Sequence, residues 1–346
     1  MGVLVAHREI QYKNKPLTIH KAVTEPNFNE KTILVTSTWD YMGLWFKRNH
    51  KEKALFYWQQ AQHFYHATTE LPKNSSPLTA YYCMLNAAKA FLLAKNITFS
   101  DRHGVSGRQR AGKTYLSNEI VKFKGGGILA ELCRYLGESA NNEEYSLQHL
   151  LYNMPFIHRA YDLSYDSSPE LFIPIKNPQI VRSRTTSEAW FSAELDKKYA
   201  NMNTVGRLSN NYEKDESITD RFVIRSVRRF QWVPSQKAQS LIRYQGYHKT
   251  LRKDLYYIHS PQRLWYIKRS NGIDGFIERS TITLIFAAMH KLSELSRYNP
   301  ERLAKHFEGR YNWLLSEFIS IAPLQFIDEL SCELTGYEFM PPGRVV

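Results

Sequence analysis

The sequence contains one run that could bind a nucleotide. Residues Gly107–Thr114, GRQRAGKT, match the phosphate-loop pattern GxxxxGK[ST], in which backbone amides and a lysine hold phosphates. That chemistry requires a strand before the run and a helix after it, so that the amides lie at a helix N-terminus. Here a predicted helix and a polar stretch come before the run. The TYLSNEIVKF segment after it has the composition of a strand and ends in three glycines. We therefore interpret Gly107–Thr114 as a basic surface loop, and nucleotide binding stays an alternative.

A second group of residues fits a metal-dependent nuclease. Glu170 and the later pair Asp196 and Lys198 could hold a metal ion beside a lysine that activates water. Acid and lysine pairs at this spacing are also common on exposed strands, where water solvates them. A nucleic-acid-processing enzyme is thus the alternative hypothesis that these residues support.

Two Arg–His pairs have the spacing found in helical HEPN ribonucleases. They are Arg243 with His248 and Arg252 with His259. We expect both pairs in strands and loops around Gly246, where this chemistry would not form. The sequence also lacks the GxSxG and HExxH patterns, so we predict no catalytic residues and no cofactor.

The histidines and cysteines do not predict a metal site. His63 and His66 lie three residues apart on a predicted helix, but no third ligand is evident. Cys83, Cys133 and Cys332 lie far apart and form no CxxC pair, which argues against a zinc site and a disulfide framework. We predict no bound metal.

The strongest charge feature is a basic zone rich in aromatic residues. The chain carries a formal net charge of +13, and between Arg221 and Arg269 twelve basic residues face the single acid Asp254. Such mixing suits an anionic surface, either a lipid membrane or a nucleic acid. The alternative is a sheet with aromatic side chains inside and cations in water. The residues expected at the anionic surface are Arg221, Arg225, Arg228, Arg229, Trp232, Arg243, Lys249, Arg252, Lys253, Trp265, Lys268 and Arg269.

The helices and strands expected around these residues predict an α+β fold that is mostly helical. Hydrophobic spacing predicts a helical hairpin over residues 53–96, and short runs rich in β-branched and aromatic residues predict an antiparallel sheet over residues 170–276. We expect the C-terminal helices to pack back on the N-terminal bundle. Further helices are predicted at Ile128–Leu136, Ser146–Leu151, Ser280–Arg297, Glu301–Leu315 and Phe318–Leu334.

The chain divides into four predicted regions that form one cooperative unit. They are an N-terminal extension (1–52), a helical region (53–160), a basic and aromatic β region (161–279) and a C-terminal helical region (280–346). The N-terminus has no apolar run of signal-peptide length, and no charge-free stretch is long enough to span a bilayer. We therefore expect a cytoplasmic protein.

Three motifs resemble those of the YaaC-like bacterial proteins. They are the segment Tyr81–Ala90, the His103–Gly104 loop followed by basic residues, and Leu292–Pro300. The similarity extends in order from about Ala54 to Phe339, and residues before Lys53 have no counterpart that we can place. The motif residues of interest are Tyr82, Asn86, Lys89, His103, Gly104, Arg297 and Tyr298.

The resemblance implies a helical protein of the cytosol without established enzymatic activity. The family includes the JukA component of a two-protein anti-phage system, in which it resembles a sensor of early infection that works with JukB. A JukB-like protein is therefore the partner that the resemblance implies for this chain. The resemblance to a sensor of early infection also implies a lipid membrane, ahead of nucleic acid, as the anionic partner, with recruitment to that membrane surface during infection. Because Tyr82, Asn86 and Lys89 share one helix face, we expect either a ligand site there or a polar contact that pins the loop after His103.

Overall fold

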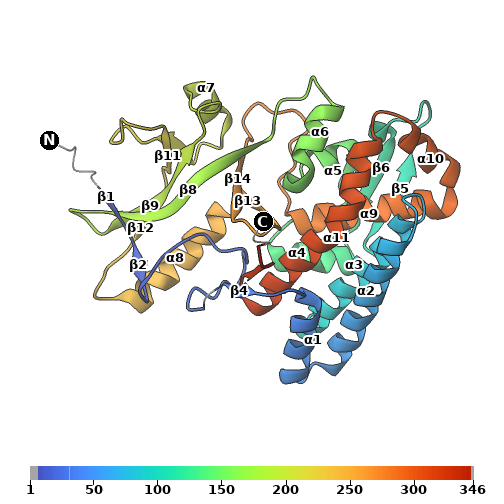
Figure 1. Ribbon diagram of the computed structural model, residues 1–346, viewed down its shortest axis with the longest axis horizontal. Coiled ribbons are helices and arrows are strands. Elements are labelled where there is room, and N and C mark those ends of the chain that lie inside the picture. The colour runs from blue at the N-terminus through green and yellow to red at the C-terminus, as the bar shows by residue number, and fades with distance from the viewer. Residues whose placement is uncertain (1–6, 31, 344–346) are drawn as a thin grey trace.

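The molecule has two lobes, one built mainly of helices and one built around a large antiparallel sheet (Figure 1). The computed structural model describes residues 7–30 and 32–343. The first described residues belong to the sheet lobe, residues 38–164 build much of the helical lobe, and the chain returns to helices after residue 280. The predicted α+β class, with C-terminal helices packed on the N-terminal ones, is confirmed.

The helical lobe is organised around two buried helices, α3 (Ser76–Ala94) and α9 (Thr281–Tyr298), which pack against each other. Both are apolar around most of their circumference, as expected of helices covered on all sides. The predicted hairpin is formed by α2 (Glu52–Glu70) and α3, with Pro77 in the first turn of α3. Further helices are α1 (Thr38–Arg48), α4 (Ile128–Leu136), α5 (Leu147–Tyr152), α6 (His158–Ser164), α10 (Pro300–Glu308) and α11 (Asn312–Thr335).

The last two helices divide at a different point from the predicted one. The sequence predicts helices at Glu301–Leu315 and Phe318–Leu334. Instead, α10 ends at Glu308, Gly309 takes an extended conformation, and α11 continues through Pro323. Glycine loses more conformational freedom in a helix than other residues, which favours the break there. The buried packing of α11 against α3 and α9 keeps that helix continuous.

A small antiparallel sheet lies against α9 in the helical lobe. Its strands are β5 (Val105–Gln109), β6 (Glu119–Phe123) and β7 (Glu144–Ser146), with β6 in the middle. β6 confirms that the TYLSNEIVKF segment contains a strand. After β6, residues 124–127 lead directly into α4.

The large sheet forms the second lobe and is centred on the hairpin of β8 (Phe172–Ser183) and β9 (Glu188–Leu195). Its strand order is β10-β11-β9-β8-β14-β13, while β1 also pairs with β8 and β12 with β9. The remaining strands are β1 (His7–Glu9), β10 (Tyr212–Lys214), β11 (Val223–Ser226), β12 (Phe230–Gln231), β13 (Leu255–Ile258) and β14 (Leu264–Lys268), and the short helix α7 (Met202–Arg207) precedes β10.

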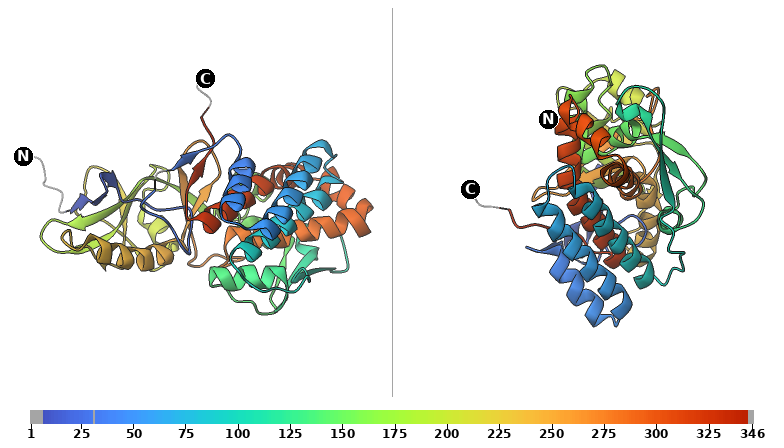
Figure 2. Two further views of the ribbon diagram at one scale, coloured as in Figure 1. Left: turned by 90° about the horizontal axis from the view of Figure 1, so that it is seen from below. Right: turned by 90° about the vertical axis from the view of Figure 1, so that its right-hand side faces the viewer.

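Helix α8 (Lys237–Leu251) covers one face of the large sheet (Figures 1 and 2). The sequence predicts strands and loops here, so this helix corrects that prediction. Its buried residues Leu241, Tyr244 and Tyr247 recur at three-residue spacing and join the core of the sheet lobe. Tyrosine is common in strands, and tertiary packing overrides that weak preference.

The N-terminal segment belongs to both lobes. Ile10, Ile19 and Phe28 are buried in the core of the sheet lobe, whereas Trp39 and Phe46 are buried in the helical core. The two-residue strands β2 (Gln11–Tyr12) and β3 (Lys15–Pro16) pair with each other, and β4 (Ile33–Leu34) pairs in parallel with β15 (Phe339–Met340). Over its described residues, the segment predicted as an extension thus joins the two cores.

Candidate functional site

The aromatic side chains of the basic aromatic zone point into the sheet lobe. Trp232 and Trp265, which the sequence predicts at an anionic surface, are only 2% and 5% exposed. The ring of Phe230 lies 5.4 Å from that of Tyr244 and 4.7 Å from that of Tyr247. The prediction that these tryptophans contact a surface ligand is therefore wrong for this fold. The arrangement matches the alternative, with rings inside and many cations outside.

Two cations of the zone serve the interior of the fold. Lys268 is 1% exposed, and its Nζ donates a hydrogen bond of 2.7 Å to the carbonyl oxygen of Ile277. Burial lowers the pKa of this lysine to about 7. Arg252 donates to the carbonyl oxygens of Lys21, at 3.1 Å, and of Leu255. Lys268 and Arg252 therefore do not form an external binding surface.

Three further arginines of the zone are half-buried. Arg225 and Arg229 both pair with Glu213, and the guanidinium of Arg229 also lies 4.6 Å from the ring centroid of Trp190. Burial lowers the pKa of Arg269. These charges are partly neutralised or shielded by the sheet lobe itself.

The remaining cations of the zone are exposed, and several lie on or just after α8. Arg243 and Lys249 have no hydrogen-bond or ion-pair partner among the described residues. Lys253 lies just beyond the helix and pairs with exposed Glu278 at 3.3 Å. We name Lys237, Arg243, Lys249 and Lys253 the α8 face, and all four are exposed. The sequence contains no acidic residue from position 221 to position 253.

Two exposed arginines lie outside the α8 face. Arg228 donates a hydrogen bond of 2.8 Å to the Thr250 hydroxyl, which places it beside the helix. Arg221 pairs with Glu194 at 3.8 Å on the other side of the zone. Of the predicted surface residues, Arg243, Lys249 and Lys253 belong to the α8 face, and Arg228 lies at its margin.

The two Arg–His pairs do not form a shared site. Arg243 is exposed on α8, whereas His248 on the same helix is fully buried and accepts a hydrogen bond of 3.0 Å from the His20 amide. The expectation that Arg243 and His248 lie outside a helix is wrong, but their side chains face different surroundings. Arg252 contacts backbone carbonyls, and His259 contacts Asp328.

The Gly107–Thr114 run does not have the geometry of a phosphate loop. Its first residues, Gly107–Gln109, belong to strand β5, and Lys113 lies in the exposed turn between β5 and β6. A single 3-10 turn at Leu116–Asn118 follows instead of a helix. In the described part of the chain, no α-helix begins directly after the run, which agrees with the predicted basic surface loop.

The proposed nuclease residues do come together in one pocket. Glu170, Asp196 and Lys198 line a cavity of about 550 Å³ at the end of the β8–β9 hairpin. Glu170 accepts hydrogen bonds from Lys198 at 3.0 Å and Tyr199 at 2.7 Å, and Asp196 pairs with Lys176. Within the described chain, no group of three His, Cys, Asp or Glu residues is arranged to hold a metal ion. His63 and His66 are both exposed on α2.

The motif residues on α3 make local structural contacts. Asn86 donates to the Tyr82 carbonyl one turn earlier, and Lys89 pairs with Asp101 at 3.0 Å. The Lys89 pair holds the segment before His103, whereas the expected polar contact concerned the loop after His103. The other motif residues lie in two places, His103 and Gly104 before β5 and Arg297 and Tyr298 at the end of α9.

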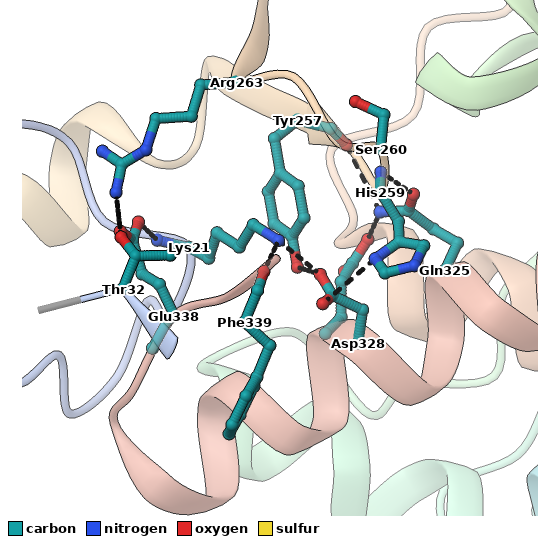
Figure 3. A network of polar contacts seen from close by, with 12 residues as sticks. Lys21, Thr32, Tyr257, His259, Ser260, Arg263, Gln325, Asp328, Glu338 and Phe339 are labelled. Carbon is teal, nitrogen blue, oxygen red and sulfur yellow. Dashed lines mark hydrogen bonds and ion pairs between the residues drawn. The ribbon is translucent and has the colours of Figure 1, made fainter. Parts of the chain in front are cut away.

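A buried polar network that sequence reasoning missed joins the N-terminal segment to α11. Figure 3 shows Lys21, Tyr257 and His259 converging on Asp328. The Lys21 Nζ lies 3.0 Å and the Tyr257 hydroxyl 2.8 Å from Asp328 Oδ2, while His259 Nδ1 lies 3.1 Å from Oδ1. Gln325 accepts a hydrogen bond of 2.7 Å from the His259 amide. No sequence signal pairs Lys21 with Asp328, because 307 positions separate them.

The electrostatics of this network favour ionised Asp328. Burial alone would raise the pKa of this carboxyl, because its side chain is 1% exposed. The charges and hydrogen bonds of Lys21 and His259 outweigh burial and hold the pKa below its usual range. Lys21 is likewise held charged, with a raised pKa, by Asp328. The pair is thus a neutralised internal contact.

The network continues along the N-terminal segment to Glu338. This carboxylate accepts hydrogen bonds from the Lys21 amide at 3.0 Å, the Arg263 guanidinium at 2.6 Å and the Thr32 hydroxyl at 3.1 Å. Figure 3 shows these groups on the side of Lys21 away from Asp328. Asp328 and Glu338 therefore both have basic partners. These contacts stabilise the position of the N-terminal segment in the fold.

The comparisons with known proteins identify one family. The model of the family described as YaaC-like Protein matches residues 19–334. The match begins earlier than the resemblance read from the motifs, so most of the segment predicted to lack a counterpart lies inside it. No curated protein and no solved structure shows a significant match. In the described residues, no helix is both long and apolar enough to cross a bilayer. Since the match covers most of its length, the chain belongs to the YaaC-like family.

Proposed function

We propose that this protein is a non-catalytic sensor or adaptor of anti-phage defence that binds an anionic lipid surface and recruits a second protein. The proposed role is that of the JukA component in the two-protein JukAB system, and the partner would be JukB-like. The observation that carries the lipid part is the α8 face, whose exposed Lys237, Arg243, Lys249 and Lys253 lie on or just after a helix without acidic residues. Support for the defence role comes from the family alone.

The α8 face has the chemistry of a reversible electrostatic contact. Each Lys or Arg near an anionic membrane contributes about 1 kcal/mol, so four cations supply weak recruitment. Ile242 is 61% exposed between the cations and can add shallow apolar contact. Because the tryptophans are buried, the contact depends mainly on charge. Binding should therefore weaken strongly when salt rises.

Charge reversal on α8 tests this proposal. The variant carries Lys237→Glu, Arg243→Glu, Lys249→Glu and Lys253→Glu. Its matched control reverses four exposed cations of the helical lobe: Lys47→Glu, Arg48→Glu, Arg110→Glu and Lys113→Glu. Co-sedimentation with phosphatidylserine vesicles should show binding by the unaltered protein and the control, and loss in the α8 variant. Equal loss in both variants would mean that net charge alone directs binding, and retained binding by the α8 variant would refute the assignment.

Nucleic acid is the competing ligand for the same face. The same proteins can be tested with single-stranded DNA and RNA at two salt concentrations, because phosphate contacts are also salt-dependent. The buried rings of Trp232 and Trp265 remove the stacking platforms that single-strand binding uses. Binding to nucleic acid without binding to vesicles would overturn the lipid proposal in favour of this alternative.

A second candidate function is nucleic-acid processing at the pocket of Glu170, Asp196 and Lys198. The observation that favours it is that all three line one cavity. The ion pair of Glu170 with Lys198, and of Asp196 with Lys176, opposes it because both carboxylates already have cationic partners. Magnesium-dependent cleavage of DNA or RNA that is lost in Asp196→Asn would establish this function. The absence of cleavage by the unaltered protein would remove it.

A further inference from the structure

A pocket in the helical lobe has a lining whose charged side chains are all basic. The cavity measures about 610 Å³ and lies where β5 begins and β6 leads into α4. Arg102, His103 and Lys124 line it together with Gly104 and Gly126. This volume is within the range of small-molecule sites. The pocket is separate from the α8 face, which belongs to the sheet lobe.

The two permanent charges at this pocket are uncompensated. The guanidinium of Arg102 and the ammonium of Lys124 are exposed and have no ion-pair or hydrogen-bond partner in the part of the chain that the structure describes. The nearby acid Asp101 is held by Lys89 at 3.0 Å and does not line the cavity. Two unpaired positive charges at one cavity match a dianion better than a monoanion.

The backbone around the pocket forms the strand, glycine loop and helix that anion binding requires. β6 is followed by Lys124 and the glycines at 125–127, and α4 begins at Ile128. The first amides of α4 donate to the carbonyls of Arg102 and His103, at 2.9 and 3.1 Å. The amides of the three glycines donate no hydrogen bond among the described residues. A Cβ at Gly126 would meet no atom within 4 Å, so its side of the loop is open.

Buried polar groups without partners lie behind the imidazole of His103. Among the residues that the structure describes, the Tyr81 hydroxyl and His290 Nδ1 have no hydrogen-bond partner, although Tyr81 is 2% and His290 6% exposed. The rings of Tyr81 and His290 lie 5.4 and 5.7 Å from the His103 ring. The acid nearest to His290 Nδ1 is Glu294 at 3.8 Å, which is beyond hydrogen-bond distance. Unsatisfied groups are uncommon in native interiors, and here they border the basic pocket.

We propose that this pocket binds the phosphate group of a small phosphomonoester. A phosphomonoester carries a charge near −2 and several strong acceptor oxygens, which match the two free cations and the free glycine amides. Arg102 and Lys124 would neutralise the charge, and the amides at Gly126 and Gly127 would bind oxygens. The Gly107–Thr114 run matches a phosphate-binding pattern by letters only, whereas residues 124–127 connect a strand to the start of a helix.

Titration with two phosphate probes and one uncharged probe tests the proposal on the full chain. Isothermal titration calorimetry is carried out with inorganic phosphate, AMP and adenosine. Inorganic phosphate and AMP should bind, and adenosine should not. Arg102→Ala with Lys124→Ala should weaken binding of AMP by at least about tenfold, since bonds to charged groups are stronger than neutral ones. Binding of adenosine as tightly as AMP, or no binding of either phosphate probe, would overturn the proposal.

Two further variants separate loss of the site from loss of the fold. Gly126→Ala adds a methyl group on the open side of the loop, without strain or clash, and should weaken AMP binding while the melting temperature stays unchanged. Arg110→Ala with Lys113→Ala removes two cations from the Gly107–Thr114 run and should leave binding unchanged. If this second variant loses AMP binding and Gly126→Ala does not, the phosphate site lies in the run and the assignment to the pocket is wrong.

Discussion

The Lys21–Asp328 network and the α8 face use the same kinds of side chain in opposite ways. In the network, Lys21 is 9% and Asp328 1% exposed, and each has its partner at 3.0 Å. On the α8 face, Arg243 and Lys249 are exposed and have no partner among the described residues. An unpaired charge in the protein interior destabilises the folded state, whereas an unpaired charge in water has little effect on stability. Charges that hold the fold are thus paired inside, and charges free for a ligand lie outside.

The cations of the basic aromatic zone also differ in whether they contact the interior or face solvent. Arg252 and Lys268 contact backbone carbonyls and aromatic rings inside the sheet lobe. Arg243 and Lys249, from the same stretch of sequence, face solvent. Reversing the charge of every cation in the zone would therefore both destabilise the fold and abolish binding. Only variants restricted to the exposed cations separate the two effects.

The largest effect is expected from breaking the buried pair. Lys21→Met removes the ammonium and leaves Asp328 buried with only Tyr257 and His259 as partners. Losing one member of a buried ion pair costs about 3–5 kcal/mol, so the free energy of unfolding should fall by that amount. Urea titration followed by circular dichroism measures it. Lys249→Met is the matched control on the α8 face, and similar losses in both variants would contradict the comparison.

A smaller loss is expected at Arg252. Arg252→Glu removes the hydrogen bonds to the carbonyls of Lys21 and Leu255 and places an acid against these oxygens. We expect the free energy of unfolding to fall by about 2–4 kcal/mol. The same change at exposed Arg243 supplies the reference in the same urea experiment. If Arg252→Glu is as stable as Arg243→Glu, Arg252 is a surface residue in solution.

The free energy of unfolding should depend on pH because the imidazole of His290 is buried and has no ion-pair partner within hydrogen-bond distance among the described residues. Burial, with added repulsion from His103 and Lys291, lowers the pKa of His290 to about 3, against 6.5 for the free side chain. The folded protein therefore binds fewer protons than the unfolded chain. The contribution of His290 to stability is complete above pH 6.5 and is lost toward pH 3, by about 1.4 kcal/mol per pH unit.

Replacing the imidazole tests this pH dependence. His290→Leu should reduce the loss of stability between pH 6.5 and pH 5 by about 1–2 kcal/mol, measured by urea unfolding at both values. A replacement at exposed His63, His63→Leu, is the control and should leave the slope as it is. An unchanged slope in His290→Leu would show that this histidine is not neutral in the fold.

The smallest effect on stability is expected on the α8 face. Arg243→Glu or Lys249→Glu alone should change the free energy of unfolding by no more than about 0.5 kcal/mol, because neither side chain has a partner among the described residues. Vesicle binding should nevertheless fall with each substitution. Thermal melting and co-sedimentation of the same preparations check both statements, and a large drop in melting temperature would place these cations in the fold.

Much of the local structure could be predicted because it depends on neighbours in the chain. Hydrophobic spacing located the α2–α3 hairpin and α4, and short runs rich in β-branched and aromatic residues located the antiparallel sheet that contains β8, β9 and β14. The sequence also determined that the zone between Arg221 and Arg269 is basic and contains many aromatic residues. It could not tell which of these side chains face inward.

Only the tertiary structure decided the rest, because it depends on residues that are distant in the chain. Packing against the large sheet made α8 a helix and turned Trp232 and Trp265 inward. Lys21 meets Asp328 across 307 positions, and no local pattern encodes that contact. The pocket at Arg102 and Lys124 forms because the chain returns through β6 beside the start of β5. Whether a charged side chain is paired depends on which residues lie near it in the folded protein. The sequence therefore supplies the charges, and the fold determines which of them remain free.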